Sequence, residues 1–233
     1  FGYYGGMPKL NLKNPEVEKY ITDVACYWIK ECDIDGWRLD VGDEISHFFW
    51  KNFRKAVKAV KKDMLIIGEI WHYAGDFLEG DEWDTVMNYP FYLNLIDLLA
   101  DEKINVSQFI QNLGYLKGRL NKKCYPLMWN LIDSHDTARF LHLCNDNKKK
   151  QHLAAAFQLL LPGMPMIYYG EEFAMPGAND PDCRRGMYWD EEYQDKEMFQ
   201  WYKQLLKVRK KHACIVEGEP IEIAARDEEE TIV

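Results

Sequence analysis

The sequence predicts an α/β fold built on a parallel sheet. Short apolar stretches that suit strands alternate with longer stretches whose apolar residues recur at helical spacing. Three of the expected strands end in an acidic residue, at Asp40, Glu69 and Asp136. In parallel α/β folds the carboxyl ends of the strands form the active face, so acids gathered there indicate a catalytic site.

The first part of the chain shows this alternation clearly. A helix is expected from Pro15, where apolar residues take helical spacing and Asn14 is placed to cap the first turn. In order, the expected elements are a helix from residue 15, a strand to residue 40, a helix over 48–62, a strand to residue 69 and an apolar segment over 85–91.

The second part continues the pattern. The expected elements are helices over 92–100 and 108–116, a strand ending near 133–136, a helix over 151–161, a strand over 165–170 and a helix over 199–210. A loop rich in Gly, Pro and Asp precedes the last helix, and the alternation over 220–233 predicts the start of an all-β appendage. Five strands are too few to close an eight-stranded barrel.

Composition excludes some classes of function. The net charge of −9 disfavours nucleic acid as a partner, and no apolar run of about twenty residues predicts a membrane span. The six cysteines form no C-x-x-C pair, so we expect reduced thiols and a cytoplasmic protein. The chain begins at Phe1 in a loop-like stretch, which indicates a start cut from something longer and leaves secretion open. Eight Trp and fourteen Tyr would suit a groove that stacks sugar faces, although core packing is their commoner use.

Two of the strand-end acids are predicted to have opposed environments. Arg38 and Asp40 are two residues apart on a strand and share a face, so the guanidinium would keep Asp40 ionised and ready as a nucleophile. Glu69 is flanked by isoleucines and a tryptophan, which would raise its pKa and keep it protonated. If the two strands are adjacent, the acids lie roughly 5 Å apart, the spacing of a retaining glycosidase.

Plainer interpretations remain for each feature. Either acid alone could be a helix N-cap, and His135 with Asp136 could be a hydrogen-bonded core pair rather than ligands of sugar hydroxyls. Phosphate-loop, dinucleotide-binding and nucleophile-elbow motifs do not occur in the sequence. Metal-ligand spacing is not found around His47, His72, His142, His152 or His212, and solvated faces are the simplest interpretation of Lys148–Lys150 and Asp227–Glu230.

Several motifs, in order along nearly the whole chain, resemble the α-amylase family, glycoside hydrolase family 13. They are G-W-R-L-D-V-G-D-E (36–44), G-E-I-W-H (68–72), N-L-I-D-S-H-D-T-A-R-F (130–140) and G-M-P-M-I-Y-Y-G-E-E (163–172). M-P-K-L-N (7–11), E-I-W-H and N-D-P-D-C-R (179–184) are similar to the neopullulanase, cyclomaltodextrinase and maltogenic amylase branch of that family.

The resemblance implies a partial (β/α)8 TIM barrel with about five of its eight strands, followed by the start of a C-terminal all-β domain. Residues 1–14 would end the inserted loop domain (domain B), 15–213 would form the C-terminal part of the catalytic barrel, and 214–233 would begin the C-terminal β domain. The family's first motif, a strand-end Asp followed by Asn-His, is absent, so we expect an N-terminally truncated fragment. Its open barrel edge predicts that the fragment alone is unstable and inactive.

The resemblance also implies roles for single residues. Asp40 would attack the anomeric carbon to form a glycosyl-enzyme intermediate, Glu69 would protonate the leaving oxygen and then activate water, and Asp136 would hold hydroxyls of the distorted sugar. The implied substrate-binding residues are Arg38, which orients Asp40, His135 on the same ring, Trp71 and Glu44 on the acceptor side, and Asp180 and Arg184 on the donor side. For the last four, an ordinary surface or core role is an equal alternative. Gly42 and Asp43 depart from the branch's pattern after the nucleophile.

The resemblance therefore implies a retaining glycoside hydrolase acting on α-1,4 bonds, with α-1,6 bonds left open. Its partners would be α-glucan oligosaccharides or cyclodextrins, including pullulan and starch oligosaccharides, with no nucleic acid and no membrane. A transglycosylase or oligo-α-glucosidase of the same family and a non-catalytic carbohydrate-binding relative are the alternatives. We expect no cofactor on this segment. An N-terminal module upstream would carry a calcium site in many relatives and would make the full-length protein a homodimer.

Overall fold

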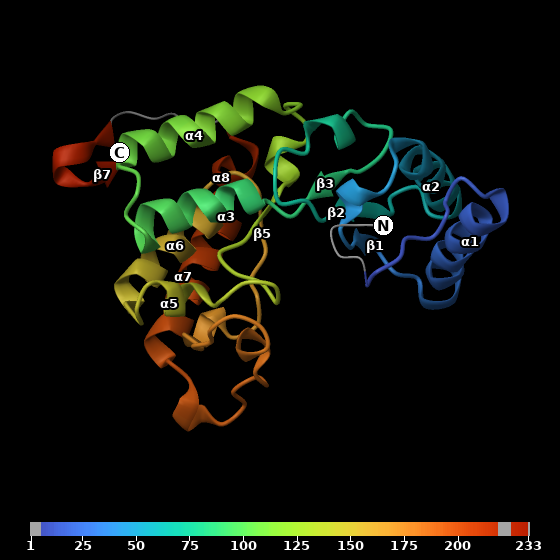
Figure 1. Ribbon diagram of the computed structural model, residues 1–233. Coiled ribbons are helices and arrows are strands. Elements are labelled where there is room, and N and C mark those ends of the chain that lie inside the picture. The colour runs from blue at the N-terminus through green and yellow to red at the C-terminus, as the bar shows by residue number, and fades with distance from the viewer. Residues whose placement is uncertain (1–5, 219–224, 233) are drawn as a thin grey trace. The chain divides into compact units, whose positions relative to one another are not determined.

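The computed structural model describes residues 6–218 and 225–232. The chain divides into two compact units, Phe1–Met87 and Asn88–Val233, whose described residues are drawn from blue to teal and from green to red in Figure 1. The division falls inside the stretch 15–213 that the sequence assigns to one barrel portion. The domain boundaries expected near residues 14 and 213 stay predictions.

A parallel sheet in the first unit places two of the predicted acids at the ends of neighbouring strands. The strand order is β1-β2-β3, and Leu39 of β1 pairs with Gly68 of β2. Asp40 and Glu69 therefore leave adjacent strands at the same level, as the sequence predicts. The three strands are β1 (Gly36–Leu39), β2 (Leu65–Gly68) and β3 (Thr85–Val86).

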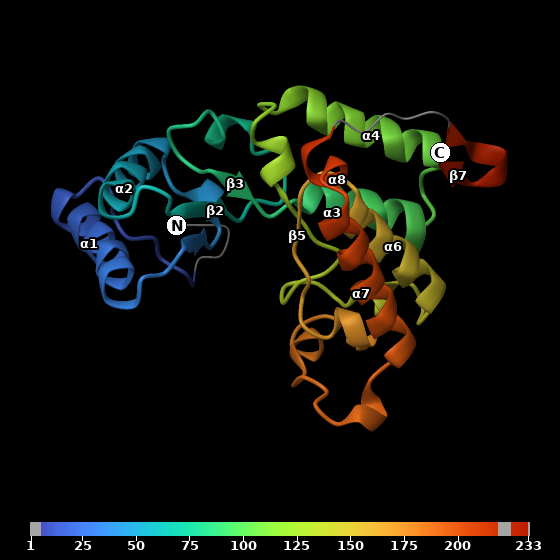
Figure 2. The ribbon, with the colours of Figure 1, turned by 180° about the vertical axis from the view of Figure 1, so that it is seen from behind.

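Two helices of the first unit pack along each other, and both views in Figures 1 and 2 show them side by side. In α1 (Pro15–Cys32) the side chain of Asn14 accepts a hydrogen bond from the Glu16 amide at 2.9 Å, which confirms the predicted cap. Helix α2 (His47–Val60) begins one residue before the predicted start, where Ser46 caps it.

The carboxyl end of β2 rests on a buried tryptophan. The Trp83 ring stacks on Phe77 with 4.1 Å between ring centroids. A Cβ atom added to Gly68 or Gly42 would lie only 2.3 or 2.6 Å from the Trp83 ring. Both positions therefore require glycine because the ring occupies the space of a side chain. The Trp83 ring therefore fixes the backbone just before Glu69, at Gly68, and two residues after Asp40, at Gly42.

The second unit holds helices around a short parallel pair, β4 and β5, and an antiparallel hairpin, β6 and β7. Helix α3 continues into one π-helical turn over Ile96–Ala100. The elements are α3 (Tyr89–Leu95), α4 (Val106–Arg119), β4 (Trp129–Asn130), α5 (Phe140–Leu143), α6 (Lys148–Leu160), β5 (Met164–Pro165), α7 (Lys196–Lys211), α8 (Cys214–Glu217), β6 (Ala225–Arg226) and β7 (Thr231–Ile232).

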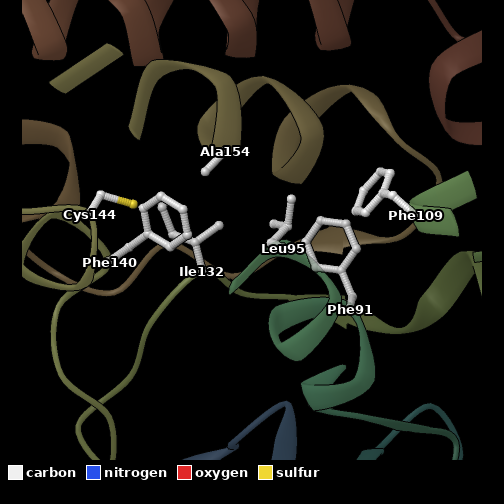
Figure 3. Close-up of a cluster of buried hydrophobic side chains, with 7 residues drawn as sticks. All are labelled: Phe91, Leu95, Phe109, Ile132, Phe140, Cys144 and Ala154. Atoms are coloured by element: carbon white, nitrogen blue, oxygen red, sulfur yellow. The ribbon is translucent and has the colours of Figure 1, made fainter. Parts of the chain in front are cut away.

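Two apolar clusters lie in the core of the described part of this unit. The first gathers side chains from α3 to α6 and is drawn in Figure 3. The second joins α6 to α7, which lie side by side in Figures 1 and 2. The first consists of Phe91, Leu95, Phe109, Ile132, Phe140, Cys144 and Ala154, and the second of Leu141, Ala155, Leu159, Ala174, Met198, Tyr202 and Leu205.

The strand predicted over 165–170 is wrong in its extent, because pairing ends at Pro165. Beyond it the Tyr168 amide donates to the Glu171 carboxylate at 3.0 Å, and Gly170 takes a left-handed φ of 89°. Local turn contacts therefore replace the ladder. The sequence pattern does not predict this end of the strand, because it does not show that the Glu171 carboxylate binds the backbone of its own segment.

The helix predicted over 151–161 begins three residues earlier, at Lys148, with Asn147 as its cap. Lysines in a first turn oppose the helix dipole, which is why the pattern does not predict helix there. Ion pairs offset that cost, from Lys148 to Asp195 and from Lys150 to Glu102, each at 2.6 Å.

The hairpin β6–β7 packs against α4, where Asp227 accepts a hydrogen bond from the Ser107 amide at 2.9 Å. The predicted alternation over 220–233 falls partly outside the described residues, so the all-β appendage stays a prediction. Across 6–218 and 225–232, no helix combines the length and apolar character needed to cross a membrane. All six cysteines are free thiols, as predicted, and Cys144 and Cys183 are buried.

Candidate active site

One arginine contacts both acids of the first unit. Arg38 Nη1 lies 2.5 Å from Asp40 Oδ1, and Arg38 Nη2 lies 3.0 Å from Glu69 Oε2. The shared face predicted for Arg38 and Asp40 is confirmed. The link to Glu69 follows from the pairing of β1 with β2, because Arg38 is paired with Ile67, two residues before Glu69. The guanidinium thus holds two carboxyl groups of neighbouring strands beside each other.

The surroundings of Glu69 are more polar than the sequence predicts. The residue is 4% exposed, but Oε2 accepts a hydrogen bond from the Val41 amide at 2.9 Å and Oε1 accepts one from Trp71 Nε1 at 3.3 Å. Successive side chains on a strand point to opposite faces, so residues next to Glu69 in the sequence do not enclose its carboxyl group. The predicted apolar enclosure is wrong in this respect.

Asp40 differs from Glu69 in exposure, since its side chain is 78% exposed. It does not cap a helix: the short 3₁₀ helix that follows begins after Val41 without a side-chain cap, and α2 is capped by Ser46. Glu69 caps no helix either, because the next helical turn begins after Ala74. The N-cap interpretation of both acids is therefore wrong.

The backbone between the two acids is strained. Val41, a β-branched residue, has a φ of 45°, in the left-handed region that such residues rarely enter. The conformation turns the Val41 amide toward Glu69, which accepts its hydrogen. Strain of this kind persists where surrounding contacts enforce it and is commonest at functional sites.

The two acceptor-side candidates lie in the same unit. Glu44 Oε2 pairs with Lys9 Nζ at 2.8 Å, so the 7–11 motif reaches the segment after β1. Trp71 is half-exposed beside Glu69. Asp43, which departs from the branch's pattern, pairs with His72 at 3.1 Å. The contact with Glu69 places Trp71 beside one of the acids, and the substrate contacts of Glu44 and Trp71 stay predictions.

The remaining predicted residues meet in the second unit around Arg184. Its Nη2 lies 3.2 Å from Asp136 Oδ1, and its Nε lies 2.7 Å from Asp180 Oδ1 and donates to the His135 carbonyl oxygen at 2.9 Å. His135 Nε2 is 3.1 Å from Asp136 Oδ2. The side chains of His135 and Asp136 are 40% and 30% exposed, so the core-pair interpretation is wrong.

This unit also contains a buried charged group that the sequence does not predict. Asp133, Arg139 and Glu171 are all buried. Asp133 and Arg139 belong to the 130–140 motif and Glu171 to the 163–172 motif, so charged residues within apolar motifs were the available signal. Within 6–218 and 225–232, no group of three or more His, Cys, Asp or Glu side chains is arranged to hold a metal ion.

With this geometry in place, comparison with known proteins identifies the family. The model of the family Alpha-amylase, described as "Alpha amylase, catalytic domain", matches residues 2–218. The chain belongs to the alpha-amylase family. The five parallel strands in the described part of the chain therefore belong to a partial (β/α)8 barrel, as the sequence predicts.

Curated relatives of the chain carry the names of the predicted branch. It is 46% identical over 228 residues to a cyclomaltodextrinase of Geobacillus thermopakistaniensis (strain MAS1), covering 98% of this chain and 39% of the relative. It is 46% identical over 212 residues to neopullulanase 2 of Thermoactinomyces vulgaris, covering 91% of this chain and 36% of the relative. The chain thus spans less than two fifths of the length of these alpha-amylase family relatives.

Solved structures agree with this placement. One, a cyclomaltodextrinase, has a TM-score of 0.94 and 41% identity and is matched over 97% of this chain and 39% of that one. Another is a cyclic alpha-maltosyl-(1-->6)-maltose hydrolase from Arthrobacter globiformis, in complex with cyclic alpha-maltosyl-(1-->6)-maltose. It has a TM-score of 0.91 and 35% identity over 94% of this chain and 50% of that one.

Proposed function

We propose that the protein carrying this chain is a retaining glycoside hydrolase that cleaves α-1,4-glucosidic bonds in cyclomaltodextrins, pullulan or starch oligosaccharides. The observation that carries the proposal is the arrangement of Asp40 and Glu69 around Arg38. Adjacent parallel strands lie about 4.8 Å apart, close to the separation of about 5–5.5 Å typical of the two carboxyl groups in retaining enzymes. The names of the relatives point to the same substrates.

The exposed acid would be the nucleophile. Arg38 holds Asp40 Oδ1, which leaves Oδ2 to attack the anomeric carbon while the bond to the leaving glucosyl oxygen breaks. The positive charge of Arg38 lies beside the carboxylate that makes this attack. The product of the step is a covalent glycosyl ester on Asp40.

The buried acid would move the proton. Glu69 Oε2 accepts a hydrogen bond from the Val41 amide and lies 3.0 Å from the charged Arg38 Nη2, whereas Oε1 has a long contact to Trp71. Oε1 is therefore the better place for the proton that passes to the leaving oxygen. In the second step Glu69 takes a proton from water, the water oxygen attacks the anomeric carbon, and Asp40 is released.

In the second unit, Asp136 and His135 would bind sugar hydroxyls, with Arg184 and Asp180 further out on the donor side. Carboxylate, imidazole and guanidinium groups offer the acceptors and donors that vicinal hydroxyls need. Contacts that strengthen as the ring distorts toward the transition state would raise kcat rather than only tighten binding.

The substitution Asp40→Asn in the complete protein tests the proposal. It should lower hydrolysis of β-cyclodextrin, pullulan and starch by about 10⁴-fold or more, because amide nitrogen and oxygen are poor nucleophiles. Release of reducing sugar measures the rate, and binding of the same glucans should persist. Normal turnover by the variant would refute the assignment, and wild-type binding without any turnover would instead favour the non-catalytic relative.

A further inference from the structure

Two buried carboxyl groups, Asp133 and Glu171, face each other in the second unit. They follow β4 and β5, which are neighbouring parallel strands. Their exposed fractions are 2% and 1%. Burial is the largest cause of the raised pKa of each acid, and each carboxyl group also acts directly on the pKa of the other, so the two side chains lie close together. Neither residue has a role in the hydrolysis proposed above.

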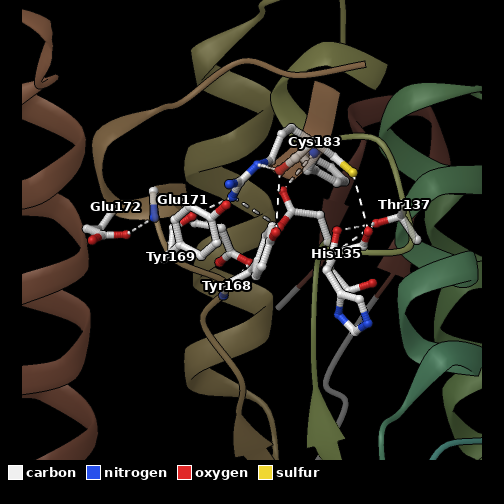
Figure 4. Close-up of polar contacts among 12 residues, drawn as sticks. His135, Thr137, Tyr168, Tyr169, Glu171, Glu172 and Cys183 are labelled. Atoms are coloured by element: carbon white, nitrogen blue, oxygen red, sulfur yellow. Dashed lines mark hydrogen bonds and ion pairs between the residues drawn. The ribbon is translucent and has the colours of Figure 1, made fainter. Parts of the chain in front are cut away.

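The hydrogen bonds around Glu171 fix its carboxyl group firmly. Oε1 accepts the Tyr168 amide at 3.0 Å, and Oε2 accepts the Tyr202 hydroxyl at 3.1 Å and Gln158 Nε2 at 3.4 Å. Figure 4 shows Glu171 beside Tyr168 and Tyr169, with His135 and Thr137 in the same network. Glu171 thus joins the segment after β5 to helices α6 and α7.

Asp133 has one satisfied oxygen and one that lacks a donor. Its Oδ2 accepts the Phe140 amide at 2.9 Å. Within the described part of the chain, the buried Oδ1 finds no donor at hydrogen-bonding distance. A proton on the Glu171 carboxyl would supply one. Buried acceptors are rarely left without a partner, so the geometry favours a proton between the two acids.

The electrostatics agree with one shared proton. Burial raises the pKa of Asp133 to about 6 and raises the pKa of Glu171 well above its usual range, where the charge of Asp133 adds to the effect. Two carboxyl groups that share a buried site do not both ionise readily, and they titrate as a pair. At neutral pH the pair therefore carries one proton and one negative charge.

That negative charge faces a buried arginine. Arg139 Nη1 lies 3.9 Å from Asp133 Oδ1. Arg139 also donates to the carbonyl oxygens of Tyr169 at 2.6 Å and Cys183 at 3.1 Å, and its guanidinium lies over the Tyr168 ring at 4.0 Å. Arg139 therefore joins the segment after β4 to the loop that follows β5.

The same loop carries Arg184, the residue next to Cys183. Cys183 Sγ and Arg184 Nε both donate to the His135 carbonyl oxygen, at 3.3 and 2.9 Å. Displacing Arg139 would therefore move the backbone on which Arg184 is held against Asp136. These consecutive contacts connect the buried Asp133 to Arg184 and, through it, to His135 and Asp136.

We propose that Asp133 and Glu171 are a positioning pair that shares one proton, balances the charge of Arg139 and so holds His135 and Arg184 beside Asp136. The inference rests on the proposed function, because that function gives Asp136 its contact with substrate. Removing the shared proton would put a second negative charge in a buried site and disturb this arrangement. The pair thereby limits activity and stability on the alkaline side.

Other groups around the pair do not titrate in the same range. Burial raises the pKa of Tyr92 to about 12 and raises the pKa values of Tyr168 and Tyr202 further above their ordinary range. The tyrosines therefore stay neutral up to pH 9. The titratable and charged groups around the pair are Arg139, Tyr92, Tyr168, Tyr202 and Glu172, which itself accepts the Gly170 amide at 2.8 Å.

The substitutions Glu171→Gln and Glu171→Leu, with Glu172→Gln as the matched control, test the inference in the complete protein. Glutamine imitates the protonated acid and keeps a donor for Asp133, whereas leucine removes every acceptor. Thermal unfolding and kcat/KM on β-cyclodextrin would be measured from pH 5 to pH 9. Because the pKa of Glu171 is raised by folding, its contribution to stability is complete below about 4.5 and is lost as the pH rises through its folded value.

The melting temperature of Glu171→Gln, relative to that of the wild type, should therefore increase as the pH rises, by several degrees at pH 9. The pH at which kcat/KM falls on the alkaline side should be higher in Glu171→Gln than in the wild type. Glu171→Leu should lose on the order of tenfold in kcat/KM at every pH. Glu172→Gln should follow the wild type. A constant difference in melting temperature with coincident pH profiles, or the same shift in Glu172→Gln, would overturn the inference. If no α-glucan were cleaved by the wild type, the proposed function would fail and the melting curves would still decide the proton-sharing pair.

Discussion

The two units contain the same three groups in two different settings. In the first, Arg38 lies against Asp40 and Glu69 at the ends of β1 and β2. In the second, Arg139 lies 3.9 Å from Asp133, which lies beside Glu171 after β4 and β5. Both sites are an arginine and two acids at the ends of neighbouring parallel strands, so chemistry alone does not separate their roles.

Exposure separates the two sites. The Asp40 side chain is mostly open to solvent, whereas Asp133 and Glu171 are buried. Glu69 is itself only 4% exposed, so the difference lies in Asp40: the first site has one open carboxylate that a substrate can reach, and the second has none. Burial also shifts the titration of the second pair, because the charged form loses its hydration. A group of strand-end acids therefore suits a nucleophilic role only where at least one of its carboxylates is open to substrate, as Asp40 is.

The largest difference between the two sites should appear when one carboxyl group of each is replaced by an amide. Glu69→Gln should lower kcat on β-cyclodextrin by about 10²–10⁴-fold because general acid–base catalysis is lost. Glu171→Gln should leave kcat near the wild-type value at neutral pH because that acid already carries a proton. Initial rates of reducing-sugar release in the complete protein measure both.

A substrate with a leaving group that needs no protonation, such as a glucosyl fluoride, sharpens this test. The first step on that substrate should lose much less in Glu69→Gln than the step on β-cyclodextrin. Equal losses on the two substrates would contradict the acid role of Glu69, and equal losses in Glu69→Gln and Glu171→Gln would erase the distinction between the sites.

The next effect concerns stability. Asp133→Asn keeps the shape of the side chain and the acceptor for Phe140 but leaves Arg139 without its buried counter-charge. The free energy of unfolding should fall by about 3 kcal/mol. Asp136→Asn is the matched control, since that exposed side chain should change the same quantity by less than about 1 kcal/mol. Denaturant unfolding of both variants gives the comparison, and similar losses would show that burial does not separate the two aspartates.

A smaller effect should follow from filling the space above Trp83. Gly68→Ala places a methyl group against the Trp83 ring and should cost about 1–3 kcal/mol of unfolding free energy. Gly114→Ala, in the exposed part of α4 where nothing lies near the new methyl group, should stabilise by about 1 kcal/mol. Melting temperatures of the two variants should move in opposite directions. A shift of the same sign in both would mean that the Trp83 contact does not constrain β2.

Local pattern was enough to predict the first site. A strand that ends in Arg38-Leu39-Asp40 and another that ends in Glu69 place their side chains by alternation alone, and the parallel pairing does the rest. The second pair could not be predicted in the same way. Asp133 and Glu171 meet because β4 and β5 pair and because α6 and α7 cover them, which depends on contacts distant in sequence.

The errors in the elements have similar causes. The strand expected over 165–170 ends early because the Glu171 carboxylate takes over the Tyr168 amide. The helix expected from Gln151 begins at Lys148 because acids distant in sequence pair with the lysines of its first turn. In both cases a side chain distant in sequence, or one that turns back on its own segment, decides where regular structure begins or ends. Residue patterns report average preferences and do not contain these partners.

The hydrogen bond from Arg184 to the carbonyl oxygen of His135 matters for any attempt to re-engineer the protein. Exchanging the 175–185 loop for that of a homologue would also remove the hydrogen bond that holds the backbone at His135. A chimaera should therefore exchange residues 133–139 together with the loop, so that both partners of these contacts come from the same protein.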